Sequence, residues 1–254
     1  MMNLNNKVIL ITGGYGYLGK EISNGLAKHG AKVVVLARSK EKFDIAFKNQ
    51  DNISFVHCDV GSTVSVSNAF SEAFKQFGSI NCLINNAFFA EGQKPLGITD
   101  DQFAHTMDGI IGNVYRCVRE IVPYFDQINA GKIINVSSMY GIVAPDFDVY
   151  KNAPEFLNPP HYGIGKAGLI QLTKYFASFL GKQNIQVNAI SPGAFPSEEV
   201  QKNSKFIKAL EEKNVLKRIG RPKDLIGAFV LLASDYSDYI TGQNIVIDGG
   251  WTIT

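Results

Sequence analysis

The 254-residue sequence has few of the features that mark secreted, membrane-spanning or nucleic-acid-binding proteins. Its only cysteines are Cys58, Cys82 and Cys117, with no Cys-x-x-Cys pair, so we expect three buried thiols and predict no metal site. No apolar run approaches the roughly 18 residues of a spanning helix, and the first residues lack a signal peptide's charged and apolar regions. The net charge of +2 is too near balance to favour nucleic acid or an anionic membrane as a partner. We therefore expect a cytoplasmic protein.

The rest of the composition is that of an ordinary globular enzyme. Hydrophobic residues make up 45% and charged residues 19% of the chain, and its length suffices for one large α/β domain with a full core. We find no internal repeat, no low-complexity tract and no linker that would divide the sequence. A single domain over residues 1–254 is therefore expected.

Short apolar runs alternate with helical patterns along the chain. The predicted strands cover residues 7–11, 31–36, 53–57, 80–84, 132–136, 184–190 and 244–248. The predicted helices cover residues 20–29, 41–49, 64–77, 100–123 and 162–180. In the last of them, the helical register predicts an apolar face made of Leu169, Leu172, Phe176, Phe179 and Leu180. The alternation of strands and helices predicts an α/β fold: a Rossmann-type, doubly wound parallel sheet of about seven strands with helices on both faces.

A glycine-rich turn follows the first predicted strand. Gly14, Gly16 and Gly19 fit the Gly-x-Gly-x-x-Gly dinucleotide fingerprint in its required place, between a strand and a helix. Residues without a Cβ let the backbone bend sharply and set its N–H groups against a pyrophosphate at the helix N-terminus. The turn therefore predicts a dinucleotide cofactor.

Arg38 stands just after the second predicted strand, at a strand tip that carries no carboxylate. In dinucleotide sites an acidic residue at this place binds the ribose hydroxyls of NAD, whereas an arginine accommodates the 2′-phosphate of NADP. We therefore expect NADP as the cofactor, with NAD as the alternative.

Tyr162 and Lys166 lie four residues apart, one turn from each other on the same face of a predicted helix. A free tyrosine titrates near pH ~10 and is a poor proton shuttle at neutral pH. A cation one turn away favours the phenolate, so we expect Lys166 to lower the pKa of Tyr162. The pair then suits general acid/base chemistry.

With these pieces in order, the chain resembles the short-chain dehydrogenase/reductase family, of the compact single-domain type, over nearly its whole length. The resemblance depends on the glycine turn at 12–19, Asp59 and Val60, Asn-Asn-Ala at 85–87, Asn-Val-Ser-Ser at 135–138, Tyr162 and Lys166, Ser-Pro-Gly at 191–193, Arg-Ile-Gly-Arg-Pro at 218–222, Tyr-Ile-Thr-Gly-Gln at 239–243 and Asp-Gly-Gly at 248–250.

The resemblance implies hydride transfer between a nicotinamide and a carbonyl or alcohol carbon. Tyr162 would give or take the proton, Lys166 would lower its pKa and hold the nicotinamide ribose, and Ser138 would hydrogen-bond the substrate oxygen. The implied cofactor-binding residues are Gly13, Gly16, Tyr17, Leu18, Arg38, Asp59, Val60, Asn86, Ala87, Tyr162, Lys166, Pro192, Gly193, Phe195 and Ser197. Relatives commonly form homodimers or homotetramers through their two long helices, so the resemblance also implies a homo-oligomer.

Three residues depart from the family's pattern. Tyr17 stands where compact members usually have glycine, and the glycine has moved to Gly16, as in sugar-nucleotide-modifying members. Phe88 replaces the glycine expected after Asn-Asn-Ala, which places a large ring close to cofactor or substrate. Ile110 occupies the place of an asparagine that relays protons to the lysine. Asn113, on the same helix face, is the candidate to replace it.

The spacing of the catalytic residues is also unusual, because Ser138 and Tyr162 are 24 residues apart, about twice the family's usual distance. Tyr150 lies 12 residues after Ser138, but four residues beyond it stands Pro154 and no lysine, so Tyr162 keeps the catalytic role. The additional residues lie within 143–160, near the active site. We expect them to form either a substrate-binding flap that offers carboxylates and amides, or a surface excursion packed against a neighbouring subunit.

The leading prediction is an NADP-dependent oxidoreductase acting on a secondary alcohol or ketone of a polar, sugar-like small molecule. The chain also resembles bacterial oxidoreductases of flagellin and surface-sugar modification. A 3-oxoacyl carrier-protein reductase is the alternative that the 218–222 stretch and the overall length permit. A catalytically silent NADP-binding sensor or subunit is the alternative outside enzymes, because Ile110 and Phe88 depart from the family's pattern.

Overall fold

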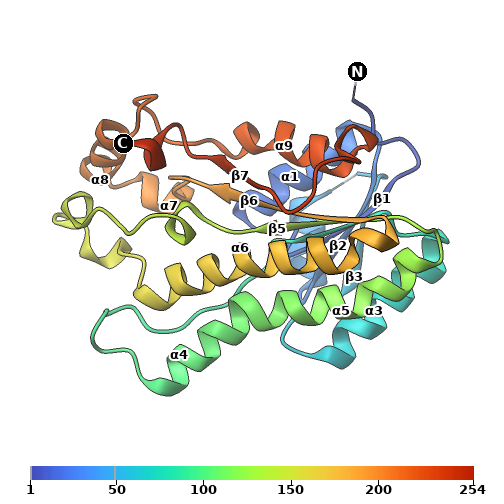
Figure 1. The fold of residues 1–254 in the computed structure, drawn as a ribbon. Coiled ribbons are helices and arrows are strands. Elements are labelled where there is room, and N and C mark those ends of the chain that lie inside the picture. Colours follow the sequence, from blue (N-terminus) through green and yellow to red (C-terminus); the bar gives the residue numbers. More distant parts are fainter. Residues whose placement is uncertain (1, 49) are drawn as a thin grey trace.

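The computed structural model describes residues 2–48 and 50–254, so the last residue of the predicted helix 41–49 lies outside the described residues. Within them, seven parallel strands form one sheet in the order β3-β2-β1-β4-β5-β6-β7 (Figure 1). The strands are β1 (Val8–Thr12), β2 (Lys32–Ala37), β3 (Ile53–His57), β4 (Cys82–Asn85), β5 (Gly131–Val136), β6 (Ile185–Pro192) and β7 (Asn244–Ile247). The predicted fold class is confirmed.

The strand order reverses between β1 and β4, which are neighbours in the sheet but not in sequence. The chain winds outward from β1 to β3 on one side and from β4 to β7 on the other. At such a switch point the loops that leave neighbouring strands diverge to opposite faces of the sheet and open a crevice at the carboxyl ends of the strands. The fold therefore fixes in advance where a ligand can bind.

Helices cover both faces of this sheet (Figure 1). The α-helices are α1 (Tyr17–Lys28), α2 (Lys40–Ala46), α3 (Thr63–Phe77), α4 (Asp100–Met107), α5 (Asn113–Asp126), α6 (Pro160–Leu180), α7 (Glu198–Gln201), α8 (Ser204–Lys213) and α9 (Ile226–Ala233). Helices α1 and α9 bury side chains in one core, and α3, α5 and α6 bury theirs in the core of the opposite face. None of the described helices is both long and apolar enough to cross a membrane.

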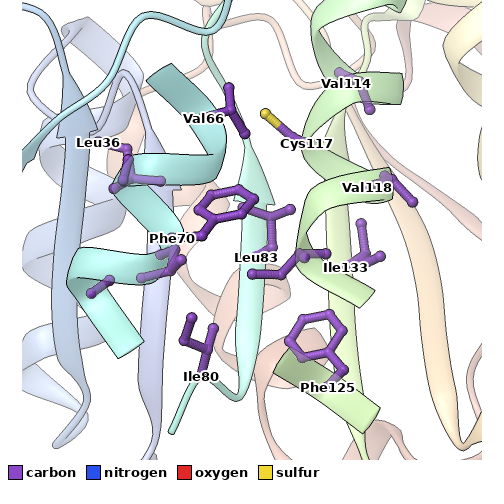
Figure 2. Packing of buried hydrophobic residues seen from close by; sticks show 14 of the residues in the cluster. Leu36, Val66, Phe70, Ile80, Leu83, Val114, Cys117, Val118, Phe125 and Ile133 are labelled. Atoms are coloured by element: carbon purple, nitrogen blue, oxygen red, sulfur yellow. The ribbon is translucent and has the colours of Figure 1, made fainter. Parts of the chain in front are cut away.

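The core under α3 and α5 shows what holds the layers together (Figure 2). Phe70 of α3 and Phe125 of α5 are fully buried in one cluster with Leu83 of β4 and Ile133 of β5. Burying each such side chain stabilises the fold by about 1.5–3 kcal/mol. The three cysteines are buried and free, as predicted, and burial raises the pKa of the Cys58 and Cys82 thiols to about 12, which makes them unreactive.

The helix predicted over 100–123 is wrong in two details. A π-helical turn, Asp108–Gly112, separates α4 from α5, and α5 continues beyond Pro123 to Asp126. Gly109 packs so close to Phe89 that a Cβ on it would lie 2.0 Å from the Phe89 carbonyl oxygen, and the Phe89 amide donates to the Gly109 carbonyl. A group inserted into the regular helical hydrogen-bond ladder is a usual cause of such a break.

Helix α6 carries the predicted apolar face with one exception. Leu169, Phe176 and Leu180 pack into the core, but Phe179 is 62% exposed and stacks on Tyr175 with 6.1 Å between ring centroids. The prediction that Phe179 belongs to the buried face is therefore wrong. Its position is rotated away from the sheet because the 3.6-residue repeat places 169, 176 and 180 on the inner face.

Candidate active site

A cavity of about 520 Å³ opens at the carboxyl ends of β1, β2, β4, β5 and β6. Every residue that the sequence predicts for catalysis or cofactor binding lines it. These are Gly13, Gly16, Tyr17, Leu18, Arg38, Asp59, Val60, Asn86, Ala87, Ser138, Tyr162, Lys166, Pro192, Gly193, Phe195 and Ser197. The structure thus brings residues from the whole length of the chain to one place, and their individual roles stay predictions.

The glycine turn forms one wall of this cavity. Gly13 has a left-handed backbone (φ +64°), and a Cβ on Gly19 would lie 2.5 Å from the Gly13 carbonyl oxygen, so both positions need glycine. Gly16 is the N-cap of α1, and among the described residues no side chain caps this helix and no acidic residue stands in its first turn. Free N–H groups and the positive end of the helix dipole therefore face the cavity, which suits a pyrophosphate.

The loop after β4 is held against the glycine turn. The Thr12 hydroxyl accepts hydrogen bonds from the Asn86 and Ala87 amides, both at 3.0 Å. The Asn86 side chain in turn donates to the Thr12 and Gly13 carbonyl oxygens at 3.0 and 3.2 Å. These bonds fix the Asn-Asn-Ala segment as the floor of the cavity, between the predicted adenine end and the predicted nicotinamide end.

Arg38 and Asp59 line the far end of the cavity. Arg38 is exposed directly after β2, where its guanidinium is free to meet an anion. The Asp59 carboxylate accepts a hydrogen bond from the Gly61 amide at 3.0 Å, which fixes the turn after β3. This end of the cavity therefore offers one cation and one carboxylate, the residues predicted for the adenosine part of a dinucleotide.

Lys166 is locked in place beside Tyr162. Its ammonium donates to the Val136 carbonyl oxygen at 2.8 Å, and its own carbonyl accepts from the Ser137 hydroxyl at 2.8 Å. Burial lowers the pKa of Lys166 to about 7, because the 3% exposed amine loses most of its hydration. Strand β5 and helix α6 thus position the amine together.

The prediction that Lys166 lowers the pKa of Tyr162 is wrong for this structure. Burial raises the pKa of Tyr162, a hydrogen bond with Ser138 opposes the rise, and the nearby Tyr150 adds to it. The physical reason is that the buried phenolate would lose its hydration, while the Lys166 amine is itself desolvated and donates to the Val136 carbonyl. The phenol of Tyr162 is therefore protonated at neutral pH.

A second cavity of about 260 Å³ adjoins the first. The two share Ser138, Tyr162, Gly193 and Phe195 in their linings, so Ser138 and Tyr162 lie where the cavities meet. The remaining lining of the smaller cavity is Met139, Tyr140, Tyr150, Phe156, Asn158, Ala194, Pro196, Val200, Phe206 and Leu210. One cavity can thus hold a cofactor while the other holds its reaction partner.

The match to known proteins agrees with this architecture. The family model described as enoyl-(acyl carrier protein) reductase matches residues 17–252. The chain belongs to the short-chain dehydrogenase/reductase family. It is accordingly an NAD(P)-dependent oxidoreductase.

Relatives within the family have different activities. The chain is 29% identical to the 3-oxoacyl-[acyl-carrier-protein] reductase FabG of Chlamydia muridarum, over 96% of this chain and 97% of that protein. It is also 29% identical to the probable galactose dehydrogenase GalD of Rhizobium meliloti, over 98% of this chain and 96% of that protein. Sequence similarity at this level therefore identifies the family, and the substrate has to be inferred from the residues of the site.

Solved structures of short-chain dehydrogenases share the fold closely. A short chain dehydrogenase from Leptospira borgpetersenii with bound NAD⁺ superposes with a TM-score of 0.87 at 29% identity, over 98% of this chain and 94% of that one. A gluconate 5-dehydrogenase from Burkholderia cenocepacia in complex with NADP and tartrate superposes with a TM-score of 0.88 at 26% identity, over 100% and 98%. Both nicotinamide cofactors thus occur among the relatives.

Two of the residues that differ from the short-chain dehydrogenase pattern, Phe88 and Ile110, lie near Lys166 or its helix. The Phe88 ring is half exposed, with its centroid 4.9 Å from the Lys166 nitrogen and 5.8 Å from the Tyr162 ring. Ile110 is buried, and a Cβ on Gly165 would lie 3.0 Å from it. An apolar wall therefore stands where the family pattern places small or polar side chains.

Asn113, the candidate to replace the relay asparagine absent at Ile110, bonds to the loop after β4. Its amide nitrogen donates to the Ala87 carbonyl oxygen at 2.9 Å, so the side chain holds the cavity floor. Its buried carbonyl oxygen has no hydrogen-bond partner among the described residues. Asn113 thus contacts the loop after β4, and a proton-relay role for it stays a prediction.

The 143–160 segment forms one wall of the smaller cavity, but not in the predicted manner. Asp146 pairs with Lys213 of α8 at 3.1 Å, Asp148 pairs with Lys151, and Glu155 is exposed, so none of these carboxylates lines the cavity. The segment contributes Tyr150, Phe156 and Asn158 to the lining. The expectation of carboxylates at the substrate is therefore wrong, because each of them is solvated or paired outside.

Sequence reasoning missed Tyr140 and Phe206 as site residues, whereas Phe156 and Asn158 belong to the 143–160 segment that it placed near the active site. Tyr140 follows the Ser-Ser motif closely, which was a usable signal. Phe206 had none, because it stands in a charged helical stretch and reaches the cavity only through packing of α8 against Tyr150 and Phe156. Tyr17 also gains a contact that no motif indicates, since its hydroxyl accepts from Gln201 of α7 at 3.3 Å.

Proposed function

We propose that the protein transfers a hydride between NADP and a secondary alcohol or ketone carbon of a small, polar, sugar-like molecule. The observation that carries this proposal is the position of Ser138 and Tyr162 at the junction of the two cavities. A nicotinamide in the larger cavity and a carbonyl in the smaller one would meet beside these hydroxyls. When bound, the nicotinamide supplies or accepts the hydride.

The chain's own residues supply the proton chemistry. The Tyr162 hydroxyl donates its proton to the substrate oxygen in reduction, and the Ser138 hydroxyl holds that oxygen by a hydrogen bond. Burial raises the pKa of Tyr162, so the proton that reduction requires is present on the hydroxyl at neutral pH. The Lys166 amine, anchored on Val136, lies one helical turn away to hold the ribose side of the cofactor.

NADP is preferred over NAD in this proposal because Arg38 stands at the tip of β2, where NAD sites have a carboxylate. Titration calorimetry with NADPH and NADH measures the preference directly. We expect NADPH to bind at least tenfold more tightly, and an Arg38→Ala variant to lose that difference. Equal affinities for the two cofactors would refute the preference.

The activity itself is tested with NADPH oxidation, followed at its absorbance band, against keto-sugars, β-ketoacyl thioesters and simple ketones. We expect turnover of neutral ketones, and a fall in kcat/KM of at least about 10³-fold in Tyr162→Phe with NADPH affinity retained. Tyr175→Phe, on the outer face of the same helix, is the matched control and should behave as wild type.

Two alternatives have their own outcomes in this assay. Turnover confined to β-ketoacyl thioesters would favour a 3-oxoacyl carrier-protein reductase, which the similarity to such enzymes makes the second candidate. Tight NADPH binding with no turnover on any ketone would favour a silent sensor or subunit. A role in flagellin or surface-sugar modification stays a prediction, which the relatives described above do not support.

A homodimer or homotetramer is also proposed. Tyr115 of α5 and Tyr175 and Phe179 of α6 are 47%, 60% and 62% exposed on neighbouring helices. Large exposed aromatic side chains that gather on one face mark an interaction surface. Sedimentation equilibrium distinguishes the monomer from a dimer or tetramer.

A further inference from the structure

The smaller cavity is polar only through neutral groups. None of its lining residues is an aspartate, glutamate, lysine, arginine or histidine. Asp146 of the 143–160 segment pairs with Lys213 of α8, and neither residue lines the cavity. An anionic substrate group buried here would lose its hydration without gaining a counter-charge, which is costly. The cavity therefore selects against phosphate and carboxylate groups.

Two tyrosines form the polar centre of this cavity. The Tyr140 and Tyr150 hydroxyls hydrogen-bond each other, and the two side chains are only 7% and 5% exposed. Asn158 lines the cavity beside Tyr150. Burial is the largest effect and raises the pKa of both phenols, so both stay protonated at neutral pH.

Counting protons shows what the pair can offer a ligand. Two hydroxyls carry two protons, and the bond between them uses one. Among the described residues, the bond between the two hydroxyls is the only hydrogen bond of ordinary geometry that either of them makes, so the second proton is left for another partner. A buried donor without an acceptor costs about 1–3 kcal/mol unless a partner satisfies it. A substrate oxygen in the same cavity is such a partner.

The pair is held rigidly from both sides. The Tyr150 ring packs on the Phe206 ring of α8 with 5.5 Å between centroids. The Phe156 ring also packs on Phe206, with 5.1 Å between centroids. The Gln93 side chain donates to the Glu155 and Leu157 carbonyl oxygens, which ties the segment to the loop after β4. The 143–160 segment lies beside α8 at one end of the molecule (Figure 1). A donor fixed in this way is preorganised for its ligand.

We propose that Tyr140 and Tyr150 are specificity-determining residues that select an uncharged, ring-sized substrate carrying a second oxygen near the reacting carbonyl. The proposal rests on the proposed function, since it names the substrate class of the same site. The aromatic rings of Phe156 and Phe206 supply flat apolar walls for the ring, and the free hydroxyl proton recognises the second oxygen. A volume of about 260 Å³ lies below the roughly 300 Å³ at which ligand sites commonly begin, so the substrate is compact.

The test compares three ring ketones with NADPH: 2-hydroxycyclohexanone, cyclohexanone and 3-oxocyclohexane-1-carboxylate. In each reaction the carbonyl carbon gains the hydride and its oxygen gains the proton, giving the alcohol and NADP⁺. For the wild type we expect kcat/KM about tenfold higher on the hydroxyketone than on cyclohexanone, the size expected for one additional hydrogen bond. The carboxylate should be reduced at least about 100-fold less efficiently than cyclohexanone.

The Tyr140→Phe/Tyr150→Phe double variant removes both hydroxyls and keeps both rings. Replacing both partners of a hydrogen bond by apolar groups of the same shape is nearly neutral for folding. We expect the preference for the hydroxyketone to fall from about tenfold to near one. Tyr175→Phe should keep the full preference. If the double variant does not fold, the lysine variant described next decides the question.

Val200→Lys provides a second, independent test, because Val200 lines the cavity and is only partly buried. A cation at this place should raise kcat/KM on the carboxylate at least about tenfold relative to cyclohexanone. An unchanged preference in the phenylalanine variants, or a wild type that reduces the carboxylate as well as cyclohexanone, would overturn the substrate class while leaving the oxidoreductase intact. No reduction of any ketone would instead count against the proposed function.

Discussion

The larger cavity is lined by residues that directly follow β1, β2, β3, β4, β5 and β6, whereas the smaller cavity adds residues of the 143–160 segment and α8 to those that follow β5 and β6. The first set stands on loops whose backbone is fixed by the sheet and by bonds such as those between Thr12 and Asn86. The second set is held by aromatic contacts between elements remote in sequence, such as Tyr150 and Phe206. We call the larger cavity the cofactor side and the smaller cavity the substrate side. Because the sheet holds the first and side-chain packing holds the second, the two should respond differently to mutation.

The largest effect on stability is expected for Phe206→Ala, which removes the ring that Tyr150 and Phe156 both contact. Truncating a buried phenylalanine costs about 3–5 kcal/mol. Urea unfolding should show a loss of this size, together with a raised KM for substrate and an NADPH affinity within twofold of wild type. The control Ile45→Ala, on an exposed side chain of α2, should change stability by less than about 1 kcal/mol. A parallel loss of NADPH affinity in Phe206→Ala would break the distinction between the two sides.

Lys166 lines the larger cavity beside Tyr162, and its contribution to the free energy of unfolding depends on pH. Its folded pKa, about 7, is below the unfolded value of 10.5, so between these values the unfolded chain binds the additional proton. The lysine's contribution to stability therefore rises with pH through this window and is lowest below pH 7. Lys166→Met removes the buried charge and should be more stable than wild type at pH 7 by on the order of 4 kcal/mol, because the folded pKa of about 7 lies well below 10.5 and each pKa unit corresponds to about 1.4 kcal/mol.

This gain should shrink as the pH is raised toward 9.5, measured by urea unfolding of both proteins across that range. A difference independent of pH would show that the amine is not desolvated as the structure indicates.

Gly19→Ala tests the cofactor side. An added Cβ would lie 2.5 Å from the Gly13 carbonyl oxygen, so the glycine turn must shift. Overpacking of this kind costs about 1–3 kcal/mol. We expect at least tenfold weaker NADPH binding by calorimetry. Gly181→Ala, where nothing lies within 4 Å of the added carbon, should bind NADPH normally.

The smallest effect is expected for Asp146→Asn. The Asp146 carboxylate pairs with Lys213 at 3.1 Å while both side chains are about one-third exposed, and this hydrogen bond is the main cause that lowers the carboxyl pKa. Exposed ion pairs contribute about 0–1 kcal/mol. Thermal unfolding should therefore change by less than about 1 kcal/mol, and substrate KM by less than twofold. A larger change would mean that charge, as well as aromatic packing, holds the 143–160 segment.

The cofactor side could be predicted from sequence because its residues stand at fixed offsets from strands. Gly13 and Gly19 are needed by local backbone geometry, and Asn86 and Pro192 come just after or at the end of recognisable apolar runs. The substrate side could not be predicted in this way. The polar composition of 143–160 suggested carboxylates in the site, but Asp146 and Asp148 found lysine partners outside it.

The pKa of Tyr162 shows the same limit. The four-residue spacing to Lys166 is a fact of the sequence, and the spacing alone predicts a lowered value. The direction reverses because both groups are buried and the amine is bound to the Val136 carbonyl, and neither feature follows from spacing.

The sequence by itself determined the parallel sheet, the switch-point crevice, the glycine turn and the order of the residues that reach it, because periodicity and turn chemistry are local properties of the chain. Only the tertiary structure decided which side chains form the smaller cavity, where the charges of the 143–160 segment go, and how far Tyr162 and Lys166 are desolvated. These depend on contacts between segments far apart in sequence, and no local pattern records them.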